Sequence, residues 1–490
     1  MPVTTRSAKR NSLPFDIQLC VLEWMIALGK ADSSVDVSPC AAVCKSWQVI
    51  IERELFRHLT LTLKDLELFG KYCHGRKHYV KHILLEIWLC HDLDSNLDKV
   101  CFTEATETLF VELSTWEGHG ITLEFGIVPP SEPGWISYPK RSRRFHIHYG
   151  PVPRKRSLSG NLRDLHELKE FDWDGDRDLT NDDLSELWME HGLDIQGHEH
   201  LAFHDDSDVG TSLLAKVACV SKLLIRRRYM PNISSHSLST IIKSLPSLES
   251  IQLERWCYGR HLYDDKWDSD LDNTTIALPE SLKEFTYYEE CGTNYHQRDG
   301  EEPHRLNPMF KDVLIKAADR IEHIAISFSA SSLLNPNADF KFTALKTLAI
   351  TSNALLHDMD GLVDLPLLRC AATAAKRMPK LEVFEIWCYK NGMALQAQVF
   401  TYQRLGKYSS CITWKENRGP RKIPERLQRA WKEVADGENG IFQVKYEFLT
   451  LEWTLWKRIT LGLGSSSYVL TRCFDLEGGP PSLPADEKLS

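Results

Sequence analysis

The stretches "LKTLAI" at Leu345–Ile350 and "LEVFEI" at Leu381–Ile386 share one pattern: apolar, two variable residues, apolar, one variable residue, apolar. Their last two apolar residues stand two apart, and side chains two apart point to the same face of a β-strand. The first apolar residue then anchors the turn that enters the strand. The pattern recurs as "FRHLTL" from Phe56, "VKHILL" from Val80, "LKEFDW" from Leu168, "VSKLLI" from Val220, "LESIQL" from Leu248, "LKEFTY" from Leu282 and "IEHIAI" from Ile321.

Segments with helical spacing precede several copies of this pattern, such as "SSHSLSTIIKSL" and "FKDVLIKAADR". From Val220 onward the copies start 28, 34, 39, 24 and 36 residues apart. A unit of one strand and one helix cannot bury its apolar face alone, so neighbouring units stack. The chain thus resembles leucine-rich-repeat proteins of the irregular kind, and we expect an α/β solenoid over residues 57–390. The alternative is a set of unrelated strands in an α/β domain.

Other segments depart from this repeat. Residues 128–161 form a basic loop insertion that carries seven Lys/Arg between Glu132 and Arg156. Residues 391–473 alternate strand-like runs with a helix that opens near Pro424, which predicts a small α+β extension at the end of the solenoid. Residues 1–11 and 474–490 are expected to be a disordered stub and a disordered tail.

Two short helices are expected at residues 12–56. The first, "LPFDIQLCVLEWM", begins at Leu13, and Pro14 suits the first turn of a helix. Helical spacing places four of its apolar residues on one face: Ile17, Cys20, Val21 and Trp24. The second helix, "CAAVCKSWQVIIERELF", follows Pro39 and has an apolar face of Val43, Trp47, Ile50, Ile51 and Leu55.

These two helices resemble the F-box, which has a Leu-Pro opening, an Ile three residues later, an Ile/Val-Leu pair and a Val-Cys-Lys/Arg-x-Trp segment. In this sequence the features fall on Leu13-Pro14, Ile17, Val21-Leu22 and Val43-Cys44-Lys45-x-Trp47. The resemblance implies that an apolar groove of a Skp-family adaptor receives Leu13, Pro14, Ile17 and Leu22. It also implies that a second contact, or the join between the helices, is formed by Val43, Cys44 and Trp47.

An F-box followed by leucine-rich-like repeats is similar to the substrate receptors of cullin–RING ubiquitin ligases. The stretch "MPKLEVFEIWCYKNGMALQAQVFTYQ" is also similar to F-box-like proteins of filamentous fungi. The resemblance implies an adaptor, a cullin scaffold and a protein target as partners, with no catalysis by the chain itself. In the alternative hypothesis the helices only cap the open end of the solenoid, as every solenoid requires.

Trp256 and Trp387 are candidate target contacts because each follows a copy of the strand pattern, where we expect the strand to leave the stack. Tryptophan often anchors binding hot spots, although it fills cores as well. Both side chains are therefore proposed as contacts for a protein target.

Composition bounds the remaining functions. The net charge of -9 argues against nucleic-acid and membrane partners, and no run approaches the roughly 18 apolar residues of a membrane span. The 13 cysteines are irregularly spaced, which favours a reducing compartment and predicts a cytoplasmic or nuclear protein. We find no phosphate loop, dinucleotide fingerprint or hydrolase triad, and no paired metal-ligand spacing. The sequence therefore predicts no catalytic residues, no cofactor and no metal.

Overall fold

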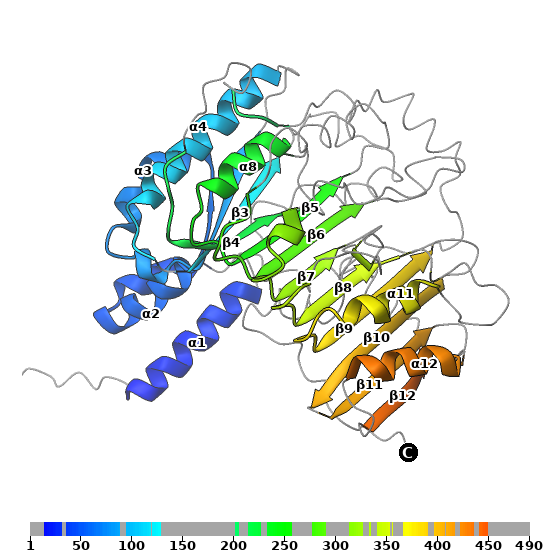
Figure 1. The fold of residues 1–490 in the computed structure, drawn as a ribbon. Coiled ribbons are helices and arrows are strands. Elements are labelled where there is room, and N and C mark those ends of the chain that lie inside the picture. The colour runs from blue at the N-terminus through cyan, green and yellow to red at the C-terminus, as the bar shows by residue number, and fades with distance from the viewer. Residues whose placement is uncertain are drawn as a thin grey trace, which may run out of the picture.

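The fold is that of a computed structural model, which describes residues 14–31, 36–88, 95–118, 120–128, 201–204, 214–226, 233–256, 277–290, 313–326, 333–334, 341–352, 355, 366–390, 396–406, 408–416, 422–435 and 441–448. Its centre is one open sheet of twelve strands whose spatial order is the order of the chain, β1 to β12. Figure 1 shows the sheet running across the molecule, with the chain's helices packed along it. The α/β class expected from the sequence is confirmed.

The first nine strands pair in parallel. They are β1 (His58–Leu61), β2 (His82–Trp88), β3 (Ile121–Val128), β4 (Val220–Ile225), β5 (Ser250–Trp256), β6 (Glu284–Glu290), β7 (His323–Ile326), β8 (Thr347–Thr351) and β9 (Val383–Lys390). Eight of them coincide with copies of the apolar pattern. The ninth copy, at Leu168, lies outside the described residues.

Strand β3 is the one that the pattern missed. The β2–β3 register begins at His82 and Thr122, and extending it back by two residues places Gly120, with a φ of 68°, opposite Val80, the first apolar position of the neighbouring copy. A left-handed backbone of this kind favours glycine over an apolar side chain. The remaining two pattern positions, Leu123 and Phe125, are buried as in the other strands. The backbone conformation therefore removed the signal that marks each of the other parallel strands.

Helices connect the strands and pack on one face of the sheet. They are α3 (Leu63–Cys73), α4 (Ser95–Ser114), α8 (Ser235–Lys243), α11 (Pro366–Ala375) and α12 (Glu425–Lys432). Under them runs a continuous row of apolar side chains, one from each strand, set by the strand registers. The row consists of Leu59, Ile83, Leu123, Leu223, Ile251, Phe285, Ile324, Leu348, Phe384, Tyr402, Ile412 and Val444.

The predicted C-terminal extension continues this same sheet. Strands β10 (Gln396–Gly406) and β11 (Ser409–Glu416) pair antiparallel, and β12 (Ile441–Phe448) returns parallel to β11 after α12. Trp431 of α12 is fully buried against three rings, with centroid distances of 5.3 Å to Phe384, 4.9 Å to Phe400 and 5.2 Å to Tyr402. The strands and helix expected within residues 391–473 are therefore present, and Pro424 is the N-cap of α12.

The N-terminal part is helical, as expected. It contains α1 (Phe15–Ala31), the one-turn 3-10 helix η1 (Ser38–Ala42) and α2 (Lys45–Leu55). The second predicted helix is thus divided at Val43 and Cys44, because Cys44 adopts an extended conformation and caps α2. Of the predicted basic insertion at residues 128–161, Val128 is the last residue of β3 and the rest lies outside the described residues, as do residues 1–11 and 474–490. Among the described helices, none is both long enough and apolar enough to cross a membrane.

Candidate protein-docking surface

Helix α1 is apolar on two opposite sides. Its inner side buries Leu22, which is 1% exposed, in the packing of α1 beside α2. Its outer side carries Ile17, Cys20, Val21 and Trp24, which helical spacing had placed together. We call these four residues the α1 outer face. A helix that is apolar all round normally has protein or lipid on both sides, so this face requires explanation.

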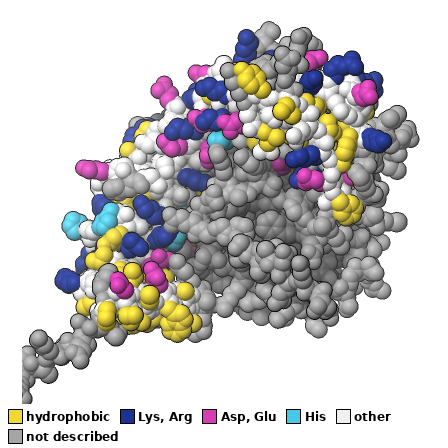
Figure 2. All heavy atoms as spheres, turned by 90° about the horizontal axis from the view of Figure 1, so that it is seen from below, with side chains coloured by type: hydrophobic (Ala, Val, Ile, Leu, Met, Phe, Trp, Pro, Cys, Tyr) yellow, Lys and Arg dark blue, Asp and Glu magenta, His cyan; other side chains and the backbone are white. Residues whose placement is uncertain are grey.

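The α1 outer face is turned toward solvent. Ile17 is 49% exposed, Val21 is 37% exposed and Trp24 is 65% exposed, and Cys20 is exposed as well. Figure 2 shows hydrophobic side chains gathered over this end of the molecule, at its lower left. Single exposed apolar residues are common on protein surfaces, but a contiguous apolar set on one helix indicates a binding surface.

The segment from η1 to α2 adds exposed apolar side chains. Val43 and Val49 are 62% and 54% exposed. Trp47 is half-buried, and its indole Nε1 donates a hydrogen bond to Oε1 of Gln18 at 3.1 Å, which ties α2 to α1. One side of the two-helix unit is therefore held together by side-chain contacts, and the other is left open.

Cys44 is exposed at the N-cap of α2. Its Sγ lies 3.1 Å from Oγ of Ser46. The pKa of the Cys44 thiol is lowered, first by this hydrogen bond with Ser46 and next by the backbone N–H of Trp47. A thiolate at the start of a helix is also favoured by the helix dipole. Cys44 is therefore an accessible thiol in a setting that favours its thiolate form.

The predicted adaptor contacts divide into three groups. Leu13 lies outside the described residues. Pro14 is exposed, its carbonyl accepts the first hydrogen bond of α1 from Gln18 at 3.1 Å, and Ile17 is exposed beside it. Leu22 is 1% exposed on a helix that packs beside α2, so in this conformation its side chain is not accessible to a partner. Sequence comparison with the F-box pattern assigned it a contact because the pattern does not distinguish the two apolar sides of α1.

The other predicted contacts fall as follows. Val43 and Cys44 are accessible, whereas Trp47 joins the helices. Val21 and Trp24 were not predicted as contacts, although they belong to the α1 outer face. The signal that identifies them is their helical spacing from Ile17, since residues at intervals of three and four share a side of a helix.

Neighbouring cations Arg76 and Lys77 fasten this unit to the rest of the fold. Arg76 Nη2 lies 2.7 Å from Oε1 of Glu52 on α2, and its guanidinium stacks 5.3 Å from the ring centroid of Phe56. The hydrogen bond from Arg76, and a second from Gln48, hold the pKa of Glu52 below its ordinary value. Arg76 thus links α2 to the turn before the 3-10 helix η2 (Lys77–Tyr79).

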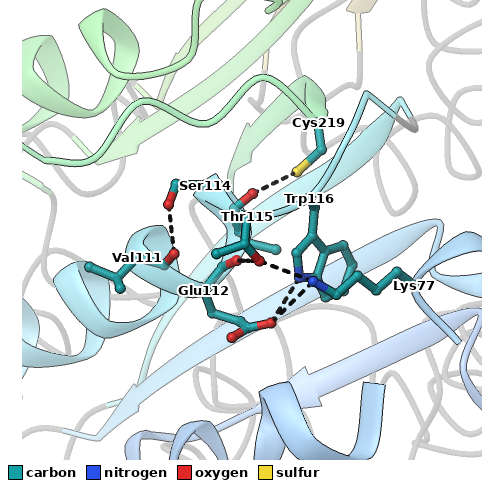
Figure 3. Close-up of polar contacts among 8 residues, drawn as sticks. Lys77, Val111, Glu112, Ser114, Thr115, Trp116 and Cys219 are labelled. Atoms are coloured by element: carbon teal, nitrogen blue, oxygen red, sulfur yellow. Dashed lines mark hydrogen bonds and ion pairs between the residues drawn. The ribbon is translucent and has the colours of Figure 1, made fainter. Parts of the chain in front are cut away.

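Lys77 makes the corresponding link to α4. Its Nζ donates to Oγ1 of Thr115 at 3.0 Å and lies 5.1 Å from the centroid of the Trp116 ring (Figure 3). Nε1 of Trp116 donates in turn to Oε1 of Glu112 at 2.9 Å. Arg76 and Lys77 therefore join α2 to η2 and to the end of α4 through a short polar network.

The target contacts predicted from tryptophan are placed only by their backbones. Trp256 is the last residue of β5, as expected for a residue at the end of a strand. Trp387 instead lies within β9, where it pairs with Thr351 on one side and Val399 on the other. The expectation that Trp387 follows the strand was wrong, because β9 continues to Lys390 to pair with the antiparallel β10.

Charged residues also lie on the sheet face opposite the helices. Glu124 is fully buried, with Oε2 3.0 Å from Nε2 of His82 and Oε1 3.1 Å from Nε of Arg226. The His82 ring meets His58 edge-on at 5.8 Å. A buried carboxylate needs such partners, and removing one of them is costly. These side chains form a row of polar contacts across β1 to β4 on that face of the sheet.

No group of three or more His, Cys, Asp or Glu among the described residues is arranged to hold a metal ion. Residues 277–470 match the model of a family of unknown function, DUF6546. That range begins before β6 and extends beyond β12, and it covers less than half of the 490 residues. No curated protein matches the chain. The matched part contains α11 and α12, while α1 and α2 lie outside it.

Proposed function

We propose that this chain is an F-box-type substrate receptor, which links a target protein to a Skp-family adaptor and a cullin scaffold in a ubiquitin ligase. The observation that carries the proposal is the α1 outer face, a contiguous apolar surface on the helix that resembles the F-box. Aliphatic and aromatic side chains on one helix, entering a partner's groove, are a common mode of protein recognition. In this proposal the chain performs no catalysis and acts in the cytoplasm or nucleus.

In the same proposal the parallel part of the sheet is an irregular leucine-rich-repeat-like solenoid, with β10 to β12 at its end. Sequential parallel strands with helices on one face support this interpretation. A receptor of this design increases the effective concentration of its target near the ligase. It needs separate surfaces for adaptor and target, and the long sheet keeps them apart.

The alternative is an interaction scaffold whose N-terminal helices only cap the sheet. Capping is served by α2, because Ile51 is fully buried and Phe56 packs against the main core. The α1 outer face takes no part in that packing. A cap does not need this exposed apolar face, whereas a binding partner would cover it. The α1 outer face therefore favours the receptor over the scaffold.

Co-purification with a Skp-family adaptor tests the proposal. The variant combines Ile17→Ala, Val21→Ala and Trp24→Ala, and the matched control removes three exposed apolar side chains of α4 by Leu97→Ala, Val100→Ala and Val111→Ala. We expect the first variant to lose the adaptor and the control to retain it, with similar melting temperatures. Adaptor recovery that is equal in all three proteins would contradict the proposal.

A further inference from the structure

Helices α11 and α12 lie beside each other near the last strands of the sheet, far from α1 (Figure 1). Their inner sides are apolar: α11 buries Leu368 and Ala371, and α12 buries Leu427 and Trp431. A salt bridge of 2.7 Å between Lys376 Nζ and Glu433 Oε2 joins the end of α11 to the end of α12. The two outer sides therefore form one continuous surface.

This surface is strongly basic. Residues 366–380 contain four cations and no acid, and residues 422–433 contain four cations and two acids, Glu425 and Glu433. The local balance is eight positive against two negative charges, in a chain whose net charge is -9. We call the cations of these segments the α11–α12 basic surface: Arg369, Lys376, Arg377, Lys380, Lys422, Arg426, Arg429 and Lys432.

The cations of the two helices converge at Glu433. The pKa of Glu433 is lowered, first by the hydrogen bond from Lys376 and then by the charges of Lys376 and Arg429. One carboxylate thus faces a cation from each helix. Glu433 neutralises only part of this charge, and Arg404 of β10 adds a further cation nearby, where Nη1 donates to the carbonyl of Pro379 at 3.0 Å.

We propose that the α11–α12 basic surface binds a short acidic segment of another protein. Arginine and lysine side chains on adjacent helices can donate several charge-assisted hydrogen bonds to the carboxylates of one peptide. A helix of 8 to 10 residues is about 12–15 Å long, which matches four or five extended residues of a peptide. A long polyanion such as nucleic acid, or an anionic membrane, would extend beyond this surface and meet the rest of a chain whose net charge is -9, whereas a short acidic peptide would contact the basic residues alone.

In the proposed receptor this surface would select targets that carry acidic segments. That use rests on the proposed function, whereas the binding of an acidic peptide does not. Helix α12 contacts β11, whereas α1 packs on α2, which contacts β1. Strands β11 and β1 stand near opposite ends of the sheet. An adaptor on α1 would therefore leave the basic surface accessible.

The test uses the full chain and a fluorescent twelve-residue peptide that contains six glutamates, with a second peptide in which glutamine replaces each glutamate. Fluorescence anisotropy at low and at physiological salt measures binding. The α12 variant combines Lys422→Gln, Arg429→Gln and Lys432→Gln; all three side chains are exposed, the last two on α12 and Lys422 just before it. The matched control removes three exposed cations at the other end of the sheet by Lys64→Gln and Lys71→Gln on α3 and Lys81→Gln just before β2.

We expect the acidic peptide to bind the unmodified chain with an affinity that falls as salt rises. The affinity of the α12 variant for this peptide should be at least about tenfold lower. The control should stay within about twofold, and the glutamine peptide should not bind. An equal loss in the control would overturn the inference. So would tighter binding of single-stranded RNA or of phosphatidylserine vesicles than of the peptide.

Adaptor co-purification separates the two proposals. The α12 variant should retain the adaptor, because the α1 outer face is unchanged. Peptide binding without adaptor recovery would contradict the proposed function and support this inference. Adaptor recovery without peptide binding would support the proposed function and contradict this inference.

Discussion

Adjacent residues Val21 and Leu22 of α1 should respond in opposite ways to the same truncation. Leu22 is buried on a helix that packs beside α2, whereas Val21 belongs to the α1 outer face. Truncating a buried leucine to alanine costs about 2–5 kcal/mol. An isolated helix of 17 residues is only marginally stable in water, so α1 depends on this packing. Leu22→Ala should therefore release α1 from α2.

Hydrogen exchange measured by mass spectrometry on peptides of α1 gives the assay. A loss of about 2 kcal/mol corresponds to roughly 30-fold faster exchange through local opening. Val21→Ala alters a partly exposed side chain and should change stability by less than about 0.5 kcal/mol, or about twofold in exchange. In adaptor binding, Val21→Ala should weaken the complex through the lost contact while α1 remains folded.

The combination of results is decisive. Unchanged exchange in Leu22→Ala would refute the assignment of the inner side of α1. Faster exchange in Val21→Ala, to the extent seen with Leu22→Ala, would refute the assignment of the outer side. Trp24→Ala provides a further comparison, because truncation of an anchoring tryptophan in an interface costs about 2 kcal/mol or more in binding and little in the free chain.

Three further outcomes follow from single contacts. Trp431→Ala removes a fully buried ring from an aromatic cluster and should lower the free energy of unfolding by about 3–5 kcal/mol, measured by urea denaturation. At neutral pH, Cys44, whose thiol has a lowered pKa, should be alkylated well before Cys219, whose pKa burial raises to about 11. A bound adaptor should slow the alkylation of Cys44. The Glu52–Arg76 pair should stabilise α2 at neutral pH, because the folded-state pKa of Glu52 is lowered. Arg76→Ala should therefore lower the melting temperature at neutral pH, and this difference should shrink as the pH falls through the folded-state pKa of Glu52.

The parallel strands were predictable because their chemistry is local. In all nine parallel strands, two apolar residues at an interval of two face the helices, as at Ile251 and Leu253 of β5. In eight of them the residue three positions before this pair is apolar as well. The period of two identifies a strand wherever one face is buried. Gly120 shows the limit of the approach, since a left-handed backbone removed one apolar position from an otherwise regular strand.

The sequence did not predict that β10 to β12 would share a sheet with the repeats. Each strand was identified from its own residues, but strand pairing depends on long-range contacts such as Phe400 beside Ile386 and Trp414. Nothing in a single strand specifies its neighbour. The same reason explains why the Glu124 row, built from strands distant in sequence, had no detectable sequence signal.

Helix α1 shows why apolar spacing identifies a helix face but does not tell whether that face is buried or exposed. Ile17, Cys20, Val21 and Trp24 have the spacing of a core stripe, and Leu22 on the other side has the same chemistry. Which side of α1 is buried depends on how α1 packs beside α2, and in this packing Leu22 is the buried residue. An exposed apolar face lowers solubility and adds nothing to folding. Since Ile51 and Phe56 already close the end of the core, the α1 outer face is better explained by a bound partner than by a cap.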